Sequence, residues 1–254
     1  MVLDAGRQAG QRVLEALAGE PAPAAVLLAG SHAVGTATPG SDIDFTVLVD
    51  DEAAIEHVLG RLETEFALLG SFHEVPHFRF ASSRLAVCTY HRGWVDDWVA
   101  HAFRSAGDLR QWQGWLQHKI VDAVALHDPG DLLRGYQRHL RTYPAALADE
   151  VAAQALEHLH TAYLDDWGFR NAYHFAYCLR DILEHLGTAL FARNRRFYAP
   201  PLKHWHRQLA SLKPPLEEAL QQLVALSPEA DLAGKRELLL TIVERLRATK
   251  TTGA

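Results

Sequence analysis

Four residues near the N-terminus combine side-chain types and a spacing suited to phosphate and metal chemistry. The apolar run at 27–29 ends in Gly30-Ser31, and Asp42 and Asp44 follow after ten further residues. Residues two apart on a strand point to one face, so the two carboxylates are expected side by side. They repel each other unless a cation lies between them, and Mg²⁺ is a divalent ion that prefers oxygen ligands. The pattern predicts a metal-phosphate site.

The segments around these residues predict two strands joined by a loop. The apolar run at 24–29 indicates a buried strand, and the run at 42–49 indicates a second strand with two carboxylates near its start. Gly30 lets the backbone approach a ligand closely, and N–H groups after Ser31 can point at a phosphate. The intervening segment is rich in glycine and proline, which indicates a turn and a loop. Ser41, directly before the first aspartate, can hydrogen-bond a carboxylate or a phosphate.

The rest of the first half continues the α/β pattern. Helical spacing of apolar residues predicts amphipathic helices over 4–19 and 50–67. Short strands at 77–81 and 84–91, separated by two serines, indicate an antiparallel hairpin. About four strands and two or three helices form a small mixed sheet covered by helices.

The second half is predicted to be all-α. A turn at 127–130 separates the halves, so we expect an α/β domain over 1–127 and an α-helical bundle over 128–254. Prolines interrupt the helical spacing. The predicted helices cover 131–141, 146–164, 168–193, 202–211, 214–225 and 230–248.

Composition narrows the classes of partner. The chain has 254 residues, 48% of them hydrophobic, and a net charge of −6, which argues against binding a nucleic-acid backbone. Small-molecule partners fit this charge better. No apolar segment is long enough to cross a bilayer and residues 1–11 lack a signal-peptide pattern, so we expect a cytoplasmic protein without a membrane partner. Cys88 and Cys178 are expected to be reduced thiols.

The pattern Gly30-Ser31-x10-Asp42-x-Asp44 resembles the polymerase-β-like nucleotidyltransferase superfamily. In the second half, segments 127–130 and 192–205 resemble the helical domain of its small-molecule branch, which includes the aminoglycoside nucleotidyltransferases. The resemblance implies a nucleotidyltransferase domain over 1–127 and an acceptor-binding bundle over 128–254. It further implies Mg²⁺-dependent transfer of a nucleoside monophosphate, AMP from ATP, to a hydroxyl of a small-molecule acceptor, with release of pyrophosphate. Either a monomer or a homodimer is compatible with the sequence.

The resemblance assigns a role to each residue of the pattern. Gly30 and Ser31 would bind the triphosphate, while Asp42 and Asp44 would hold Mg²⁺, with two ions possible. Lys203 belongs to a basic cluster that begins at residue 193. This lysine either faces the triphosphate or belongs to a solvated helix end that favours the helix dipole.

One element of the family pattern is missing. Family members usually carry a third carboxylate on a neighbouring strand, but 84–91 contains none, and we expect Thr89 or His91 at that position. Three interpretations remain: another residue supplies the base, the acceptor needs no strong base, or the site is catalytically weak. A carboxylate acceptor is already ionised at neutral pH, so adenylation of an acid for amide or ester formation is an alternative function. A non-catalytic or regulatory nucleotide-binding protein, similar to an antitoxin, is another.

A polar stripe on the long helix 168–193 could serve the acceptor. His174 and Asp181 share one helix face, and Glu184 lies nearby in the sequence. These three residues are candidates for an acceptor-side group or for the base, and the alternative is a solvated helix face.

Overall fold

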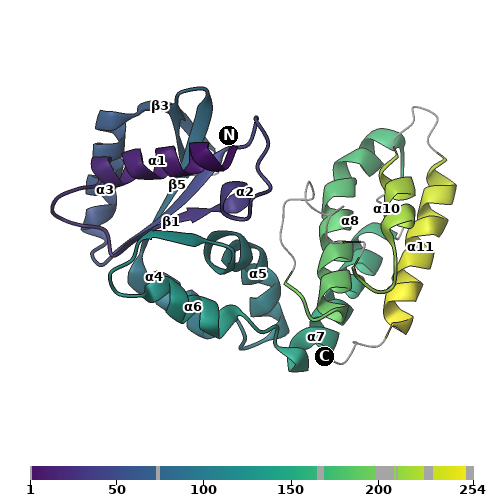
Figure 1. Ribbon diagram of the computed structural model, residues 1–254. Coiled ribbons are helices and arrows are strands. Elements are labelled where there is room, and N and C mark those ends of the chain that lie inside the picture. Colours follow the sequence, from purple (N-terminus) through teal and green to yellow (C-terminus); the bar gives the residue numbers. More distant parts are fainter. Residues whose placement is uncertain are drawn as a thin grey trace. The chain divides into compact units, whose positions relative to one another are not determined.

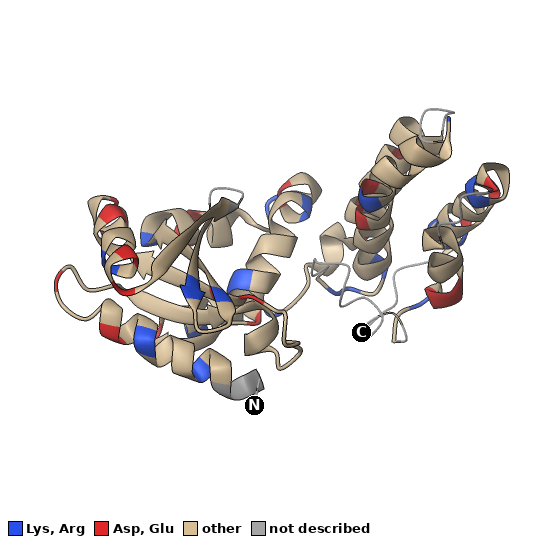
Figure 2. Cartoon of the chain, turned by 90° about the horizontal axis from the view of Figure 1, so that it is seen from above, with Lys and Arg blue, Asp and Glu red and all other residues tan. Residues whose placement is uncertain are grey.

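The computed structural model describes residues 2–72, 75–164, 169–197, 209, 211–225 and 231–249. The chain forms two compact units (Figure 1). The first unit comprises Met1–His101 and Trp115–Thr142, and the second comprises Ala102–Gly114 and Tyr143–Ala254. The functional division expected after residue 127 stays a prediction. Charged residues of both signs are spread along the helices of each unit (Figure 2).

The first unit is built on a mixed sheet of six strands in the order β3-β4-β5-β2-β1-β6. Only β2 and β5 pair in parallel, and the other neighbours are antiparallel. The predicted mixed sheet is confirmed, with β3 and β6 in addition to the expected strands. The strands are β1 (Ala25–Ala29), β2 (Ile43–Val49), β3 (Ala67–Phe72), β4 (Val75–Phe80), β5 (Ser83–His91) and β6 (Val124–His127).

One face of the sheet is an apolar core. Alternate residues of β2, such as Phe45 and Val47, are fully buried in one cluster with Val13 and Leu62. The latter two come from the helices α1 (Val2–Ala16) and α3 (Ala53–Glu65). The predicted first strand, second strand and helices therefore form the expected sheet with helices on it.

The opposite face carries the polar residues of β2. The ladder aligns Asp44 with Ala29 of β1 and Ala86 of β5, so these three residues lie on this face. Farther along β5, Tyr90 packs edge-on against Trp98 and Trp115. Nearby segments of the first unit include α2 (Gly30–Ala33), α4 (Arg92–His101), the π-helical turn η1 (Gln117–Val121) and α6 (Leu132–Leu140).

The second unit is helical, as predicted. Its core joins residues such as Leu156, Phe175, Leu186 and Ile242 in one buried cluster. The predicted helix over 202–211 falls largely outside the described residues. In the part of the chain that the structure describes, no helix is both long and apolar enough to cross a membrane. The described helices of the second unit are α5 (Ala106–Leu116, shared with the first unit), α7 (Ala145–Leu159), η2 (His160–Leu164), α8 (Ala172–Arg193), α10 (Glu217–Val224) and α11 (Leu232–Ala248).

Candidate active site

Asp44 is the centre of a polar site in the first unit. Its side chain is 19% exposed, and its Oδ1 accepts a hydrogen bond of 2.9 Å from Lys119 Nζ. His118 Nε2 lies 3.7 Å from the other carboxylate oxygen. Both side chains come from η1, a π-helical segment of the kind that often occurs at functional sites. The chain therefore places a largely buried carboxylate against two basic groups.

The neighbours of Asp44 keep its carboxyl ionised. Burial raises the pKa of this carboxyl, but the interaction with His118 and the positive charge of Lys119 outweigh burial. The net result is a pKa well below the ordinary value for aspartate. A carboxylate that stays charged when mostly removed from water is suited to interact with cations.

At position 30, next to this carboxylate, only glycine fits. Its φ is +65°, in the left-handed region that favours glycine. A Cβ added there would lie 2.3 Å from Asp44 Oδ2 and 3.1 Å from His118 Cε1. The next residue, Ser31, is 4% exposed at the start of the short α2. The predicted Gly-Ser turn thus lies directly against the predicted carboxylate.

Asp42 has a separate partner. It precedes the first residue of β2, and its Oδ1 accepts a hydrogen bond of 2.8 Å from Arg84 Nε. The Asp42 side chain is 29% exposed and that of Arg84 is 60% exposed. Ser41 is engaged within its own loop, where its Oγ accepts a hydrogen bond from the Thr38 backbone N–H. The structure therefore gives each of the two aspartates its own cationic side chain.

The register of β2 and β5 identifies the neighbour of Asp44 on the next strand. Asp44 pairs with Ala86, whereas Thr89 pairs with Val47 and His91 with Val49. Paired residues lie on the same face, and Val47 belongs to the apolar core. Thr89 and His91 therefore lie on the face opposite to Asp44, and the structure does not bring them to it. The side chain beside Asp44 is a methyl group.

Three residues at this site were absent from the sequence-based candidates. They are Arg84, His118 and Lys119, which contact the two aspartates. His118 and Lys119 lie in a stretch with ordinary helical spacing of apolar residues. Lys119 is 75 residues after Asp44 in the sequence. Nothing in that pattern marks them as partners of a strand residue. Among the described residues, no group of three or more His, Cys, Asp or Glu side chains is arranged to hold a metal ion.

The acceptor-side candidates lie on α8 in the second unit. The Asp181 carboxylate accepts a hydrogen bond of 3.1 Å from the Tyr163 hydroxyl, and Glu184 accepts one of 3.1 Å from Arg180 Nε. His174 Nε2 lies 3.7 Å from Cys178 Sγ. These residues have partners within their own unit, and their assignment to an acceptor stays a prediction. Lys203 lies outside the described residues.

One segment of the first unit is similar to a known family. Residues 11–80, which contain the Gly-Ser turn and both aspartates, match the family model described as "Nucleotidyltransferase domain". This segment of the first unit is therefore similar to a nucleotidyltransferase domain. Within it, Gly30 and Asp44 lie close together, as described above. No curated protein matches the chain.

Two solved structures resemble the chain at low sequence identity. A nucleotidyltransferase-like protein from Exiguobacterium sibiricum is 16% identical, with a TM-score of 0.45, over 94% of this chain and 73% of that chain. The spectinomycin adenyltransferase AAD(9) from Enterococcus faecialis is 13% identical, with a TM-score of 0.35, over 96% of this chain and 99% of that chain.

Proposed function

We propose that the protein transfers a nucleoside monophosphate from ATP to a small-molecule acceptor in a Mg²⁺-dependent reaction that releases pyrophosphate. The observation that carries this proposal is the Asp44 carboxylate, which stays ionised beneath Gly30 and beside two basic side chains. Binding of a triphosphate needs a carboxylate for its metal ion and positive charge for its oxygens. The family match of residues 11–80 supports the reaction class.

The two aspartates fit a divalent cation. Both are carboxylates at the start of β2, and the lowered pKa of Asp44 means that this ligand needs no deprotonation. Mg²⁺ is commonly held by one or two carboxylates together with substrate phosphates. Asp42 and Asp44 would hold the ion, which would neutralise charge on the phosphate oxygens during transfer.

The remaining residues of the site would bind the phosphates and shape the backbone around Asp44. Lys119 supplies positive charge, and His118 a ring N–H, on the sheet face where the triphosphate would lie. Gly30 lets the backbone come close to the carboxylate, and Ser31 adds a hydroxyl with only 4% exposure. These groups would hold the triphosphate in position, which is the main task of a protein in phosphoryl and nucleotidyl transfer.

Ala86 favours a second candidate, adenylation of a carboxylate. The methyl group of this residue lies beside Asp44, where a third carboxylate would be adjacent. An acceptor hydroxyl must lose a proton during attack, whereas an acceptor carboxylate is already ionised at neutral pH. Attack by a carboxylate would form an acyl-adenylate and release pyrophosphate, without a base from β5.

The primary test measures pyrophosphate release from ATP and Mg²⁺ with separate panels of aminoglycosides, other hydroxyl acceptors and carboxylic acids. We expect release with one panel, and we expect Asp42→Asn and Asp44→Asn each to reduce it by about 10²-fold or more. Asp97→Asn serves as the matched control because that aspartate is 63% exposed and pairs with His101. Full activity in both site variants would contradict the assignment. ATP binding without pyrophosphate release from any panel would favour a regulatory nucleotide-binding protein.

A second test separates the two acceptor chemistries. Hydroxylamine converts an activated acyl group to a hydroxamate, so hydroxamate formation identifies a carboxylate acceptor. Ala86→Glu adds a carboxylate next to Asp44. We expect this change to increase turnover of a hydroxyl acceptor and to leave turnover of a carboxylate acceptor unimproved. Binding of ATP must be measured in parallel, because a buried carboxylate also adds local negative charge.

A further inference from the structure

The outer strand of the sheet has an open edge. β6 pairs with β1 and stands last in the strand order, so its other edge has no neighbouring strand among the described residues. Its burial is low, with Val124 48% exposed. An edge of this kind presents backbone N–H and C=O groups that can pair with an added extended segment.

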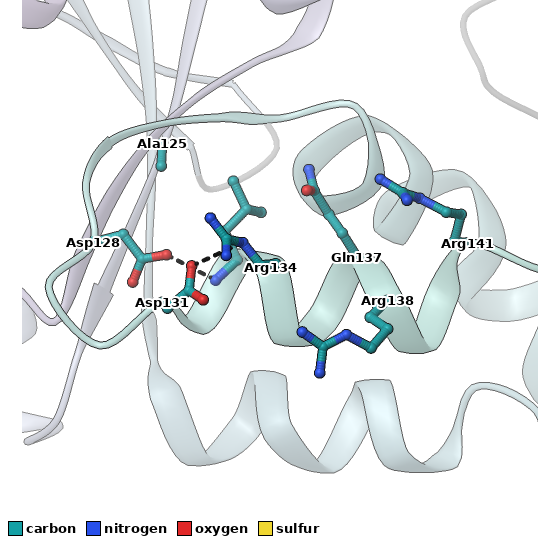
Figure 3. A pocket seen from close by; sticks show the side chains of 8 residues that line it. Ala125, Asp128, Asp131, Arg134, Gln137, Arg138 and Arg141 are labelled. Carbon is teal, nitrogen blue, oxygen red and sulfur yellow. Dashed lines mark hydrogen bonds and ion pairs between the residues drawn. The ribbon is translucent and has the colours of Figure 1, made fainter.

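An arginine-rich helix face runs beside this strand. Arg134 and Arg138 of α6 and Arg141, which directly follows its last residue, keep the i, i+4, i+7 spacing of one helix face, and all three are exposed. Together with Gln137 of the same helix and Ala125 of β6, they line a cavity of about 490 Å³. Figure 3 shows α6 alongside the strand segment, with Arg134, Gln137 and Arg141 pointing to the side of Ala125 and the exposed Arg138 pointing to the other side of the helix. The strand segment and the arginine-bearing helix therefore bound the cavity.

Acidic neighbours neutralise only part of this positive charge. Both Asp128 oxygens accept backbone hydrogen bonds of 2.9 Å, from the N–H groups of Leu132 and Leu133 at the start of α6. Asp131 pairs with Arg134 at 3.4 Å. Arg138 and Arg141 have no ion-pair partner within 4.0 Å among the described residues. Two positive charges thus remain at the cavity in a chain whose net charge is −6.

We propose that this surface binds an extended acidic peptide segment of a partner protein, which adds to the open edge of β6 and places its carboxylates on Arg138 and Arg141. Backbone pairing with β6 would give affinity, and the arginines would select acidic side chains. This site belongs to the first unit and uses none of the residues around Asp44, so the inference is independent of the proposed function.

The dimensions of the two elements agree with this occupant. The four residues of β6 span about 13 Å at the rise of a strand, and the seven-residue step from Arg134 to Arg141 spans about 10 Å along a helix. Alternate side chains of an extended peptide lie about 7 Å apart on one face. Two acidic residues at positions i and i+2 would therefore fall within reach of the arginine side chains.

The test uses the full chain and a labelled peptide, Gly-(Glu-Val)4-Gly, whose glutamates share one face when extended. Binding is followed by fluorescence anisotropy at low ionic strength, and the same peptide with Gln in place of Glu is the charge control. We expect the Glu peptide to bind and to protect the backbone amides of 124–127 from hydrogen exchange. The Gln peptide should bind at least about tenfold more weakly than the Glu peptide.

Two charge-reversal variants distinguish this site from general electrostatic attraction. Arg138→Glu with Arg141→Glu should weaken binding of the Glu peptide by about tenfold or more. The matched control is Arg7→Glu with Arg79→Glu, which reverses two exposed arginines elsewhere in the first unit and gives the same net charge. We expect the control to bind within about twofold of the unaltered chain. Circular dichroism checks that both variants are folded.

Four results would overturn the proposal. They are equal loss of binding in both double variants, no change in amide protection at 124–127, complete displacement of the peptide by inorganic triphosphate, and self-association of the chain that the first double variant abolishes. The third result would indicate a small-anion site, and the fourth an interface between copies of this chain.

Discussion

Two lysines with little exposure illustrate how the two units use a charge removed from water. Lys119 in the first unit is 12% exposed and donates to the carboxylate of Asp44. Lys235 in the second unit is 9% exposed and donates to the backbone carbonyls of Gln222, Leu223 and Ala225, at distances of 3.2, 2.8 and 2.7 Å. The first lysine meets a charged side chain, and the second meets neutral backbone groups.

The partners of Lys235 explain its burial in structural terms. The last carbonyls of a helix have no partner within the helix, and these three carbonyls lie at the C-terminal end of α10. Lys235 satisfies them from α11, and its ammonium group also lies 5.6 Å from the centre of the Phe175 ring. Burial lowers the pKa of this lysine. Its role is therefore to join two helices.

The partner of Lys119 leads to a different conclusion. Removing a carboxylate and an ammonium group from water costs desolvation free energy. The presence of such a buried pair is therefore weak evidence that it stabilises the fold. A nucleotide and its metal ion would rearrange this pair, whereas they have no part in the contacts of Lys235. The chemistry of the partner, more than burial itself, therefore separates the charge that we propose to be functional from the structural one. Substitutions can test this separation.

The largest expected effect is that of Gly30→Ala. The added Cβ would lie 2.3 Å from Asp44 Oδ2, so the carboxylate must move. A displacement of about 1 Å at a reacting group can reduce turnover by about 10²-fold, and we expect a loss of at least that size. Pyrophosphate release measures it.

Gly35→Ala is the matched control for the glycine substitution. Gly35 also has a positive φ, of +71°, but nothing lies within 4 Å of its added Cβ. It should therefore show only the conformational cost, about 1 kcal/mol of unfolding free energy, with little loss of turnover. Equal losses of turnover in the two variants would show that the contact with Asp44 is unimportant.

Lys119→Met tests the functional charge. We expect turnover to fall by about 10-fold to 10²-fold, because the proposed triphosphate would lose a positively charged neighbour. Unfolding free energy at neutral pH should also fall, since the Lys119 charge lowers the pKa of Asp44 in the folded protein. Both quantities are compared with the unaltered chain by pyrophosphate release and urea unfolding.

The pH dependence of this substitution has a defined sign. Because the folded pKa of Asp44 is lowered, its stabilising effect is present above the unfolded pKa of about 4 and is lost as the pH falls toward the folded pKa. The stability difference between Lys119→Met and the unaltered chain should therefore shrink in acid. A difference that grows below pH 4 would contradict the role given to the pair.

Lys235→Met tests the structural charge. It leaves three backbone carbonyls without their donor, and we expect the unfolding free energy to fall by about 1–2 kcal/mol. The intrinsic turnover of the folded protein should change little. Lys213→Met is the control because Lys213 is exposed. A large loss of turnover without a loss of stability would remove the contrast between the two lysines.

Arg84→Ala should have the smallest effect. The Arg84 side chain is 60% exposed, and exposed ion pairs contribute about 0–1 kcal/mol. We expect a change in unfolding free energy within that range and turnover within a few-fold of the unaltered chain. Urea unfolding and pyrophosphate release check these values. A loss as large as that of Lys119→Met would show that Asp42 depends on its arginine as Asp44 depends on its lysine.

Local sequence patterns predicted the central strands well and the outer strands poorly. β1 is a continuous apolar run, and β2 is apolar apart from Asp44 and Thr46, because nearly all residues of both strands are buried. β6 has four residues, most of them exposed, and its sequence has no clear alternation. β3 follows directly after α3 and includes Gly70, which weakens a strand pattern. Their pairing partners, more than their own composition, make these segments strands.

The sequence by itself determined the four residues at the centre of the candidate site. A glycine at the start of a short helix and two aspartates around the start of a strand follow from local rules of backbone conformation and side-chain alternation, which act over a few residues. The helical second half followed equally from apolar spacing and proline positions. These are properties of neighbouring residues, so they can be inferred without a fold.

Only the tertiary structure decided what surrounds Asp44. The register of two parallel strands that are distant in the sequence places Ala86 beside it and turns Thr89 and His91 to the other face. The π-helical turn η1 brings His118 and Lys119 to its carboxylate from the far end of the first unit's sequence. A shift of one residue in register reverses every side chain of a strand, and no local pattern sets that register. Long-range packing therefore selected the partners of a carboxylate that the sequence had already placed.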